Sequence, residues 1–305
     1  MKKVLITGAT GLIGKKLSHS LVKEGYKVIA VTRNKNSARS QLHEGIEIIE
    51  CQLANDTIKS NLIDNVDVVI NLLGESIASG RWTPERKKEL YNSRILTTRN
   101  LIRSFSAAPK VFISGSAIGI YGDRANEDLS ETSSTGNDFL AQLCANWEVE
   151  TKKIFSLEGG INSRVINLRT GLVLSAQGGA LKKMLPAFDF GMGGILGDGE
   201  QWMSWIHIDD LVRMILFMIA NPEVSGPFNA VSSNPVKNSD FTEALVKALE
   251  VRRGPTVPKL AMKLLFGEMS TVLLSSQKVS SSKIQKLGFQ FQYKTISEAF
   301  EQLLE

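Results

Sequence analysis

Several residue types and patterns that identify particular protein classes are scarce in this sequence of 305 residues. Its two cysteines, Cys51 and Cys144, lie far apart in the chain, so we expect free thiols and no disulfide framework. Three histidines are too few and too scattered to make a metal site, and no metal is expected. The longest apolar stretch, residues 211–220, is too short to cross a bilayer and contains Arg213, so no membrane association is expected.

The sequence also lacks a large excess of either positive or negative charge. Lys and Arg total 36 against 31 for Asp and Glu, which gives a net charge of +5, and no block of like charge occurs. Nucleic acid is therefore not expected as a partner. The chain is 43% apolar and 22% charged, as is typical of globular proteins. Because it enters a strand-like run at once, we expect no signal peptide and a cytoplasmic location.

The clearest positive feature is a glycine motif at the start of the chain. Residues 4–6 form a short apolar run typical of a buried parallel strand, and a helical pattern opens at Leu12. Gly8, Gly11 and Gly14 lie around this junction at a spacing of three. Strand, glycine turn and helix together predict a dinucleotide site, because glycines let a pyrophosphate approach the backbone and the helix N-terminus attracts the anion. The expected contacts are Gly8, Thr10, Gly11, Leu12, Ile13 and Gly14.

Apolar runs alternate with helical patterns along much of the chain. Further strands are predicted at residues 27–31, 46–50, 66–73, 110–114, 162–168 and 227–231. This alternation predicts an α/β fold, a Rossmann-type doubly wound parallel sheet with a small mixed α/β region on the substrate side. We place the NAD(P)-binding domain at residues 1–221, with substrate-side insertions near 175–205. A small C-terminal domain at 222–305 is expected to pack on the substrate side.

The end of the second predicted strand bears on the identity of the dinucleotide. In a Rossmann half this strand tip meets the adenosine ribose, where an Asp or Glu accepts from the ribose hydroxyls and repels a 2′-phosphate. This chain has Thr32 and Arg33 there, and Arg binds phosphate through charge-assisted hydrogen bonds. We therefore predict NADP(H) as the cofactor, ahead of NAD(H). The alternative is that Arg33 is only a solvated loop residue.

Later strand tips add candidates for the rest of the site. The fourth predicted strand runs into Gly74, beside the expected pyrophosphate position. The fifth ends at Ser114 and Ser116, where a small hydroxyl would lie near the nicotinamide. The glycine-rich, apolar stretch 178–199 is expected to line a substrate pocket with Met184, Leu185, Phe188, Phe190 and Ile195.

Taken together, these motifs resemble one protein family. The turn TGATGLIG, spaced T-G-x-x-G-x-x-G, is similar to that of the extended branch of the short-chain dehydrogenase/reductase superfamily, which includes epimerases and dehydratases. The whole chain resembles an atypical epimerase-family subgroup of that branch, which carries a small C-terminal domain of unknown function. The other motifs that carry this resemblance include NLLGE (71–75), SGSAIGIYGD (114–123), DFLAQLCANWE (138–148), LRTGLVL (168–174), WIHIDDL (205–211) and VPKLAMKLLFGEM (257–269).

The resemblance implies an NADP-binding Rossmann fold and adds positions along the cofactor. Matched residue by residue, the cofactor contacts would include Thr32, Arg33, Leu72, Leu73, Glu89 and Arg94.

The chain departs from this family at the catalytic pair. Extended-branch enzymes carry Tyr-x-x-x-Lys on the helix after the serine strand, in which Lys lowers the Tyr pKa and Tyr acts as general acid and base. Tyr26, Tyr91, Tyr121 and Tyr293 are followed four positions later by Ala, Ile, Ala and Ser, so no such pair exists. The corresponding helix is apolar at residues 139–144. Standard epimerase chemistry therefore does not follow from the fold.

Two classes of function remain open. In the first, the protein is an NADP(H)-dependent oxidoreductase or epimerase-like enzyme for an unknown small carbonyl or sugar-type substrate. Ser116 would orient a carbonyl, and Tyr121 or a water would relay the proton. In the second, it binds NADP(H) as a sensor or regulatory protein without turnover. The glycine-rich stretch favours the first class and the missing pair favours the second; a homodimer also stays open.

Overall fold

A sheet of seven parallel strands forms the centre of the computed structural model, which describes residues 2–305. The strand order is β3-β2-β1-β4-β5-β7-β11, so the chain starts in the middle, runs outward to β3 and returns to the other side of β1. This order is typical of doubly wound folds and confirms the predicted fold class. The strands are β1 (Lys3–Thr7), β2 (Lys27–Thr32), β3 (Glu47–Glu50), β4 (Val68–Asn71), β5 (Val111–Ala117), β7 (Arg164–Thr170) and β11 (Gly226–Ala230).

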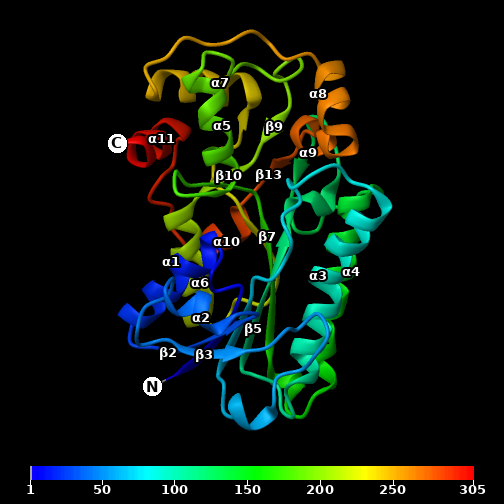
Figure 1. Cartoon of the computed structure of the whole chain (residues 1–305), viewed down its shortest axis with the longest axis vertical. Helices are drawn as coiled ribbons and strands as arrows, with labels where there is room; N and C mark the ends of the chain where they lie inside the picture. The colour runs from blue at the N-terminus through cyan, green and yellow to red at the C-terminus, as the bar shows by residue number, and fades with distance from the viewer. Residues whose placement is uncertain (1) are drawn as a thin grey trace.

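Helices cover both faces of this sheet, as the edge-on view in Figure 1 shows. One face carries α1 (Leu12–Lys23), α2 (Lys35–Arg39) and α6 (Ile208–Ala220). The opposite face carries α3 (Pro84–Arg103) and α4 (Phe139–Thr151). Because the central strands are buried from both sides, β2 and β4 consist of nearly continuous apolar runs without polar alternation.

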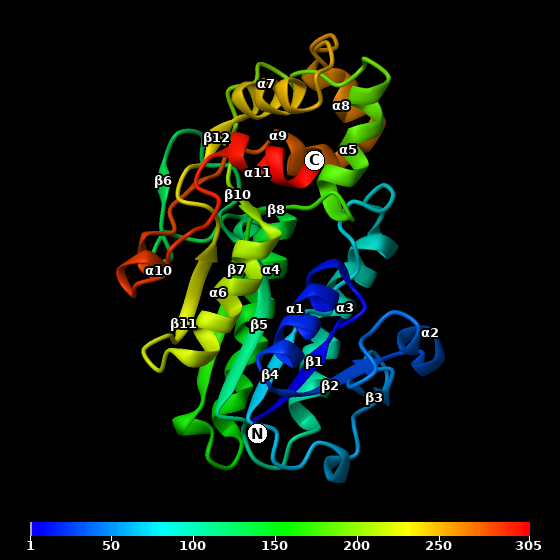
Figure 2. The ribbon, with the colours of Figure 1, turned by 90° about the vertical axis from the view of Figure 1, so that its left-hand side faces the viewer.

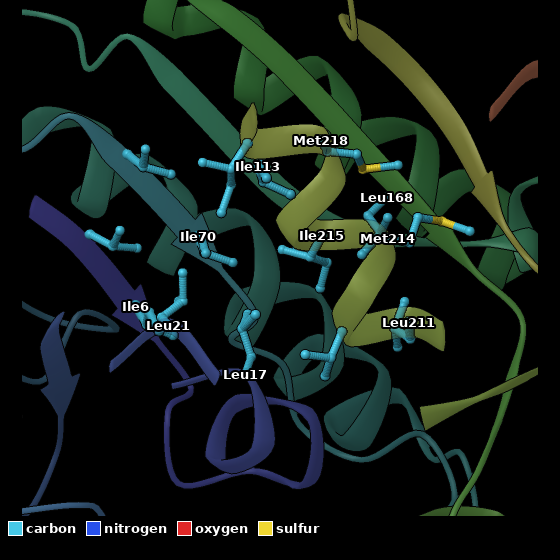
Figure 3. Close-up of a cluster of buried hydrophobic side chains, with 14 of the residues drawn as sticks. Ile6, Leu17, Leu21, Ile70, Ile113, Leu168, Leu211, Met214, Ile215 and Met218 are labelled. Carbon is cyan, nitrogen blue, oxygen red and sulfur yellow. The ribbon is translucent and has the colours of Figure 1, made fainter. Parts of the chain in front are cut away.

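The main core lies between the sheet and the α1–α6 layer. In Figure 3, one apolar side chain from each of four neighbouring strands faces side chains of the two helices, and the labelled residues are Ile6, Ile70, Ile113, Leu168, Leu17, Leu21, Leu211, Met214, Ile215 and Met218. All ten are fully buried. Burial of such a side chain stabilises the fold by about 1.5–3 kcal/mol. The core therefore holds the carboxyl ends of the strands rigidly in place.

A second apolar core lies beyond the carboxyl ends of the strands, at the top of Figures 1 and 2. It joins α5 (Gly179–Asp189), α7 (Asn238–Ala248) and α11 (Ile296–Leu304). The rings of Phe241 and Phe300 meet edge to face at its centre, with centroids 5.1 Å apart. Residues near 175–205 therefore fold together with the C-terminal part of the chain.

This second core bears on one expectation. Phe188 is buried in it, Met184 and Leu185 pack against it half-buried, and Phe190 is 78% exposed, so a substrate pocket lined by this stretch stays a prediction. Helices α5, α7 and α11 pack their apolar faces against one another, which removes all three faces from water. The main sheet also continues past residue 221, since β11 pairs with β7 over residues 226–230.

The remaining elements are short. They are β6 (Asp128–Leu129), β8 (Leu172–Leu174), β9 (Trp202–Met203), β10 (Trp205–His207), β12 (Val236–Lys237), β13 (Lys278–Val279), α8 (Lys259–Phe266), α9 (Ser270–Leu274) and α10 (Ser282–Lys286). Among the described residues, no helix has the length and apolar character that a membrane span requires.

The first turn of α6 joins the two regions. Asp210 is fully buried, and its carboxylate accepts the backbone N–H groups of Gln292 and Tyr293 at 2.9 Å each. Just before it, His207 is also fully buried and lies 2.8 Å from the Gln302 side chain of α11. The end of the chain is thus bonded directly to an element that packs on the main sheet.

Candidate cofactor site

The glycine turn after β1 has a conformation that side chains would prevent. Gly8 has a φ of +71°, and a Cβ placed there would lie 2.9 Å from the carbonyl oxygen of Leu72. A Cβ on Gly14 would collide with the carbonyl oxygen of Gly8, so this glycine lets α1 pack directly on the turn. The first and third glycines therefore serve the tight turn and the close helix packing that the fingerprint requires.

The N-terminus of α1 lies open above this turn. Gly11 is the N-cap residue in extended conformation, no side chain caps the helix, and no acidic residue occurs in its first turn. The first N–H groups of a helix have no partner within it, and here they carry the positive end of the helix dipole. An anion such as a pyrophosphate supplies both the acceptors and the negative charge that this end lacks.

A groove of about 270 Å³ runs between this turn and the β7–β8 segment. One wall consists of the glycine turn, the start of α1 and Leu72, and the other of residues 171–173 with Gly179 and Ala180. It lies between β1 and β4, where the strand order reverses and where ligands bind in open α/β sheets. The groove brings together Gly8, Gly11, Leu12, Ile13 and Gly14 from the predicted set.

Gly179 and Ala180 of the second wall belong to the stretch 178–199 that was expected to line a pocket, whereas residues 171–173 were not predicted as contacts. The sequence contained a signal in the motif LRTGLVL and in the Gly178–Gly179 pair, which lies against the Leu12 side chain. A Cβ atom on Gly178 would lie 3.2 Å from the Leu12 side chain, and one on Gly179 would lie 3.1 Å from it. Larger residues at these two positions would therefore press into the groove wall. The glycine-rich stretch therefore contributes its first residues, and not its later apolar ones, to the site.

The tips of β2 and β4 lie beside the groove. Thr32 is half-buried and Arg33 is 74% exposed at the end of β2. At the end of β4, the side chains of Leu72 and Leu73 point to opposite faces of the sheet, so only Leu72 lines the groove. Gly74 follows and is exposed.

Arg94 of α3 lies over this second tip. Its guanidinium donates to the backbone oxygens of Glu75 at 2.9 Å and Leu90 at 3.1 Å, and it lies 5.5 Å from the centre of the Trp147 ring. Burial lowers the pKa of Arg94, and no carboxylate among residues 2–305 is hydrogen-bonded to it. A half-buried cation in this state is suited to an anionic ligand.

Glu89 lies one turn before Arg94 on α3 and is largely exposed, with its carboxylate 2.8 Å from Arg86. Ser114 is fully buried in β5, where its hydroxyl lies 3.4 Å from the Asn71 side-chain nitrogen. Ser114 thus faces the interior and not the groove.

The two expected catalytic residues meet in a buried polar cluster at the ends of β5 and β7. The Ser116 hydroxyl donates to Glu148 Oε1 at 2.8 Å, and Glu148 forms a two-pronged ion pair with Arg169 at 2.8 and 2.9 Å. Tyr121 is fully buried; its hydroxyl accepts from Arg169 at 2.9 Å and donates to Asn229 at 2.6 Å. Glu148 and Arg169, which complete this cluster, were not predicted.

This cluster limits what its members can do. Burial raises the pKa of Tyr121, and Arg169 opposes that effect only in part. A carboxylate accepts hydrogen bonds and cannot donate, so the single proton of Ser116 is committed to Glu148. Ser116 therefore presents acceptor lone pairs, whereas orienting a carbonyl requires a donor. The expected donor role would require its hydroxyl to leave Glu148.

The start of α4, where the resemblance to extended-branch enzymes would place a Tyr-Lys pair, is an apolar wall. Phe139 packs edge to face on Trp82, with ring centroids 5.4 Å apart. Leu140 lies against Gly119 of the segment after β5. Within the described part of the chain, no group of three or more His, Cys, Asp or Glu side chains is placed to hold a metal ion.

Comparison with known proteins assigns a family to almost the whole chain. The model of the NAD dependent epimerase/dehydratase family matches residues 4–231, and that of a domain of unknown function, DUF1731, matches residues 257–303. The chain is 39% identical over its full length to epimerase family protein SAR0825 of Staphylococcus aureus, of which it covers 99%.

Two further relatives extend the comparison. Over 99% of its length the chain is 36% identical to the chloroplastic SDR39U1 homologue of Arabidopsis thaliana, an epimerase family protein of which it covers 86%. It also superposes on the crystal structure of human epimerase family protein SDR39U1 with NADPH, with a TM-score of 0.85 and 27% identity. That alignment covers 99% of this chain and 98% of the human one.

Proposed function

Since this chain belongs to the NAD-dependent epimerase/dehydratase family, we propose that it is an NADP(H)-binding oxidoreductase or epimerase-like enzyme for a small carbonyl or sugar-type substrate. The observation that carries the proposal is the uncapped N-terminus of α1 above a glycine turn that no other residue type could form. Both features face one groove at the switch point of the sheet. A nicotinamide dinucleotide has the length and the central pyrophosphate that such a groove accepts.

The preference for NADP(H) rests on charge. Arg33 takes the place at the tip of β2 where an acidic residue would select NAD(H). The related human protein crystallised with NADPH agrees with this choice. Arg94 adds a second cation beside Gly74.

The residues of the groove have separable tasks. The α1 N-terminus and the glycine turn would hold the pyrophosphate, Arg33 the 2′-phosphate, and Leu72 would pack along the dinucleotide. When bound, the nicotinamide supplies or accepts a hydride. Ser116 would accept a hydrogen bond from a donor on the substrate, because its own proton is held by Glu148.

A second function is favoured by a specific observation. Glu148 holds the proton of Ser116 and Asn229 holds that of Tyr121, so neither of these two residues is free to donate a proton to a ligand. A positioned general acid or base usually contributes about 10²–10⁴-fold to a rate, so its absence favours slow turnover or none. The alternative is therefore an NADP(H)-binding sensor or regulatory protein.

Two measurements decide between these functions. Fluorescence titration with NADPH and NADH tests the cofactor, and we expect tighter binding of NADPH. A screen of carbonyl compounds and nucleotide sugars, with the protein and NADPH or NADP+, then tests for reduction, oxidation or epimerisation. Tight NADPH binding without turnover of any class would leave the sensor as the better description. Failure to bind either dinucleotide would contradict both functions.

A further inference from the structure

A carboxylate lies directly beside the arginine that is expected to recognise the 2′-phosphate. Arg33 Nη1 of the β2 tip is 3.7 Å from Glu75 Oε1, which follows the β4 tip. The two side chains are 74% and 44% exposed, so both are accessible to a ligand at this edge of the sheet. No acidic residue directly follows β2 in the sequence, but Glu75, which follows β4, places a carboxylate beside the β2 tip.

Glu75 is held in this position through its backbone. Its N–H donates to the Ser93 hydroxyl at 3.1 Å, and its carbonyl oxygen accepts from Arg94 at 2.9 Å. Both partners lie on α3, which packs on the sheet. These bonds hold the backbone of Glu75 near the β2 tip, while its side chain can still rotate.

A second arginine flanks the carboxylate on its other side. Arg86 Nη2 is 3.9 Å from Glu75 Oε2 and 2.7 Å from the backbone oxygen of Ser76. Arg86 is only 18% exposed, and its Nε is buried without a hydrogen-bond partner. Glu75 therefore lies between a mostly buried cation, Arg86, and an exposed one, Arg33.

We propose that Glu75 sets the choice between the two dinucleotides, a proposal that rests on the proposed cofactor function. In the NADP(H) complex its carboxylate competes with the 2′-phosphate for Arg33 and repels that phosphate. In the NAD(H) complex it stays paired with Arg33 and accepts a hydrogen bond from a ribose hydroxyl. The chain consequently binds both dinucleotides, with a preference for NADP(H) smaller than Arg33 alone would give.

The physical basis is the interaction of close charges near a protein surface. At separations near 4 Å, such charges still interact appreciably because the surrounding medium is less polar than bulk water. Two negative groups that share one exposed guanidinium weaken each other's binding, and a neutral amide in place of Glu75 removes this competition. The same amide is a poorer acceptor for a ribose hydroxyl, because bonds to ionised acceptors are roughly twice as strong as neutral ones.

The test measures dissociation constants of NADPH and NADH by nicotinamide fluorescence for the full chain and three variants. We expect Glu75→Gln to tighten NADPH about fivefold and to weaken NADH about threefold, a modest surface-charge effect. Arg33→Met should weaken NADPH by at least about tenfold. In the Arg33→Met background, Glu75→Gln should change NADPH binding by less than about twofold, because the group for which they compete is gone.

The matched control is Glu47→Gln, which removes a carboxylate from a similarly exposed pair with Lys27 at the opposite end of β2 and β3. It should leave both dissociation constants unchanged. If Arg33→Met weakens NADPH but Glu75→Gln leaves the ratio of the two constants within twofold, or weakens both ligands, this inference is wrong and the cofactor function stands. If the unaltered protein binds neither dinucleotide, the proposed function fails as well. Should Glu75→Gln fold poorly, Glu75→Ala gives the same comparison, since its backbone bonds are retained.

Discussion

The two ends of the groove are built on opposite principles. At the glycine turn, backbone N–H groups and the Arg94 guanidinium are left with fewer partners than they can use. At the ends of β5 and β7, by contrast, the side chains of Ser116, Tyr121, Glu148 and Arg169 are hydrogen-bonded within one buried cluster that also includes Asn229. The first end is prepared for an anionic ligand, whereas the second is closed on itself.

This difference separates binding from chemistry. A groove whose polar groups await a ligand loses little by binding it, because few internal bonds must first be broken. A reaction that used Ser116 or Tyr121 as a donor would first have to open a buried ion-pair network. The contrast explains how a family fold can retain its cofactor site while the usual proton donor is missing.

The largest effect is expected from removing the buried ion pair between Arg169 and Glu148. Arg169 and Glu148 are only 9% and 12% exposed, so Arg169→Met leaves a carboxylate buried without its partner. Such a loss typically costs about 3–5 kcal/mol of unfolding free energy, measured by urea denaturation. Lys259→Met is the control, because its pair with Asp198 is about half exposed and an exposed pair contributes little to stability. Equal costs for the two variants would show that the cluster is not stabilising.

The next largest effect is expected at the glycine turn before α1. Gly11→Val places a branched side chain at the mouth of the α1 N-terminus, where a Cβ already lies 3.2 Å from the Gly8 oxygen. NADPH binding should fall at least about a hundredfold, while the protein still unfolds cooperatively. Gly45→Ala is a matched control, because its added Cβ would meet only the His43 ring at 3.4 Å. Retained binding in Gly11→Val would mean that the motif is only a turn.

The parts that could be predicted from sequence are those that local spacing determines. The glycine turn, α1 and the β2 tip are contiguous in the chain, and the expected strands correspond to the seven of the sheet. The proximity of Arg33 and Glu75 could not be predicted, because β1 lies between their strands and side-chain reach decides the contact. Likewise, the partner of Ser116 depends on α4 meeting the β5–β7 pair, in which Ser116 is opposite Arg169. Contacts of this kind come from tertiary packing.

A smaller effect is expected from removing the Tyr121 hydroxyl. Tyr121→Phe leaves the Asn229 oxygen without its donor and takes one acceptor from Arg169, at a cost of about 1–3 kcal/mol of unfolding free energy. NADPH binding should stay within twofold of the unaltered protein, because Tyr121 is sealed from the groove. Ser116→Ala should likewise leave NADPH binding within twofold of the unaltered protein. If a substrate is found, a fall in turnover for Ser116→Ala but not for Tyr121→Phe would assign Ser116 to the reaction.

The smallest effect is a pH dependence at the junction of the two regions. His207 Nδ1 accepts the Asp209 N–H at the start of α6, and its other ring nitrogen must then carry the proton that bonds Gln302. Burial lowers the pKa of His207 below its ordinary value, so the folded protein holds fewer protons than the unfolded chain at mildly acidic pH. The stability that the neutral ring provides is therefore complete above about pH 6.5 and declines as the pH falls below it. One proton limits the slope to about 1.4 kcal/mol per pH unit. Comparing the unfolding free energy of the unaltered protein and His207→Asn from pH 7 to pH 5 isolates this contribution, since the amide oxygen can still accept the Asp209 N–H but does not titrate. An identical pH dependence in the two proteins would show that His207 does not contribute to it.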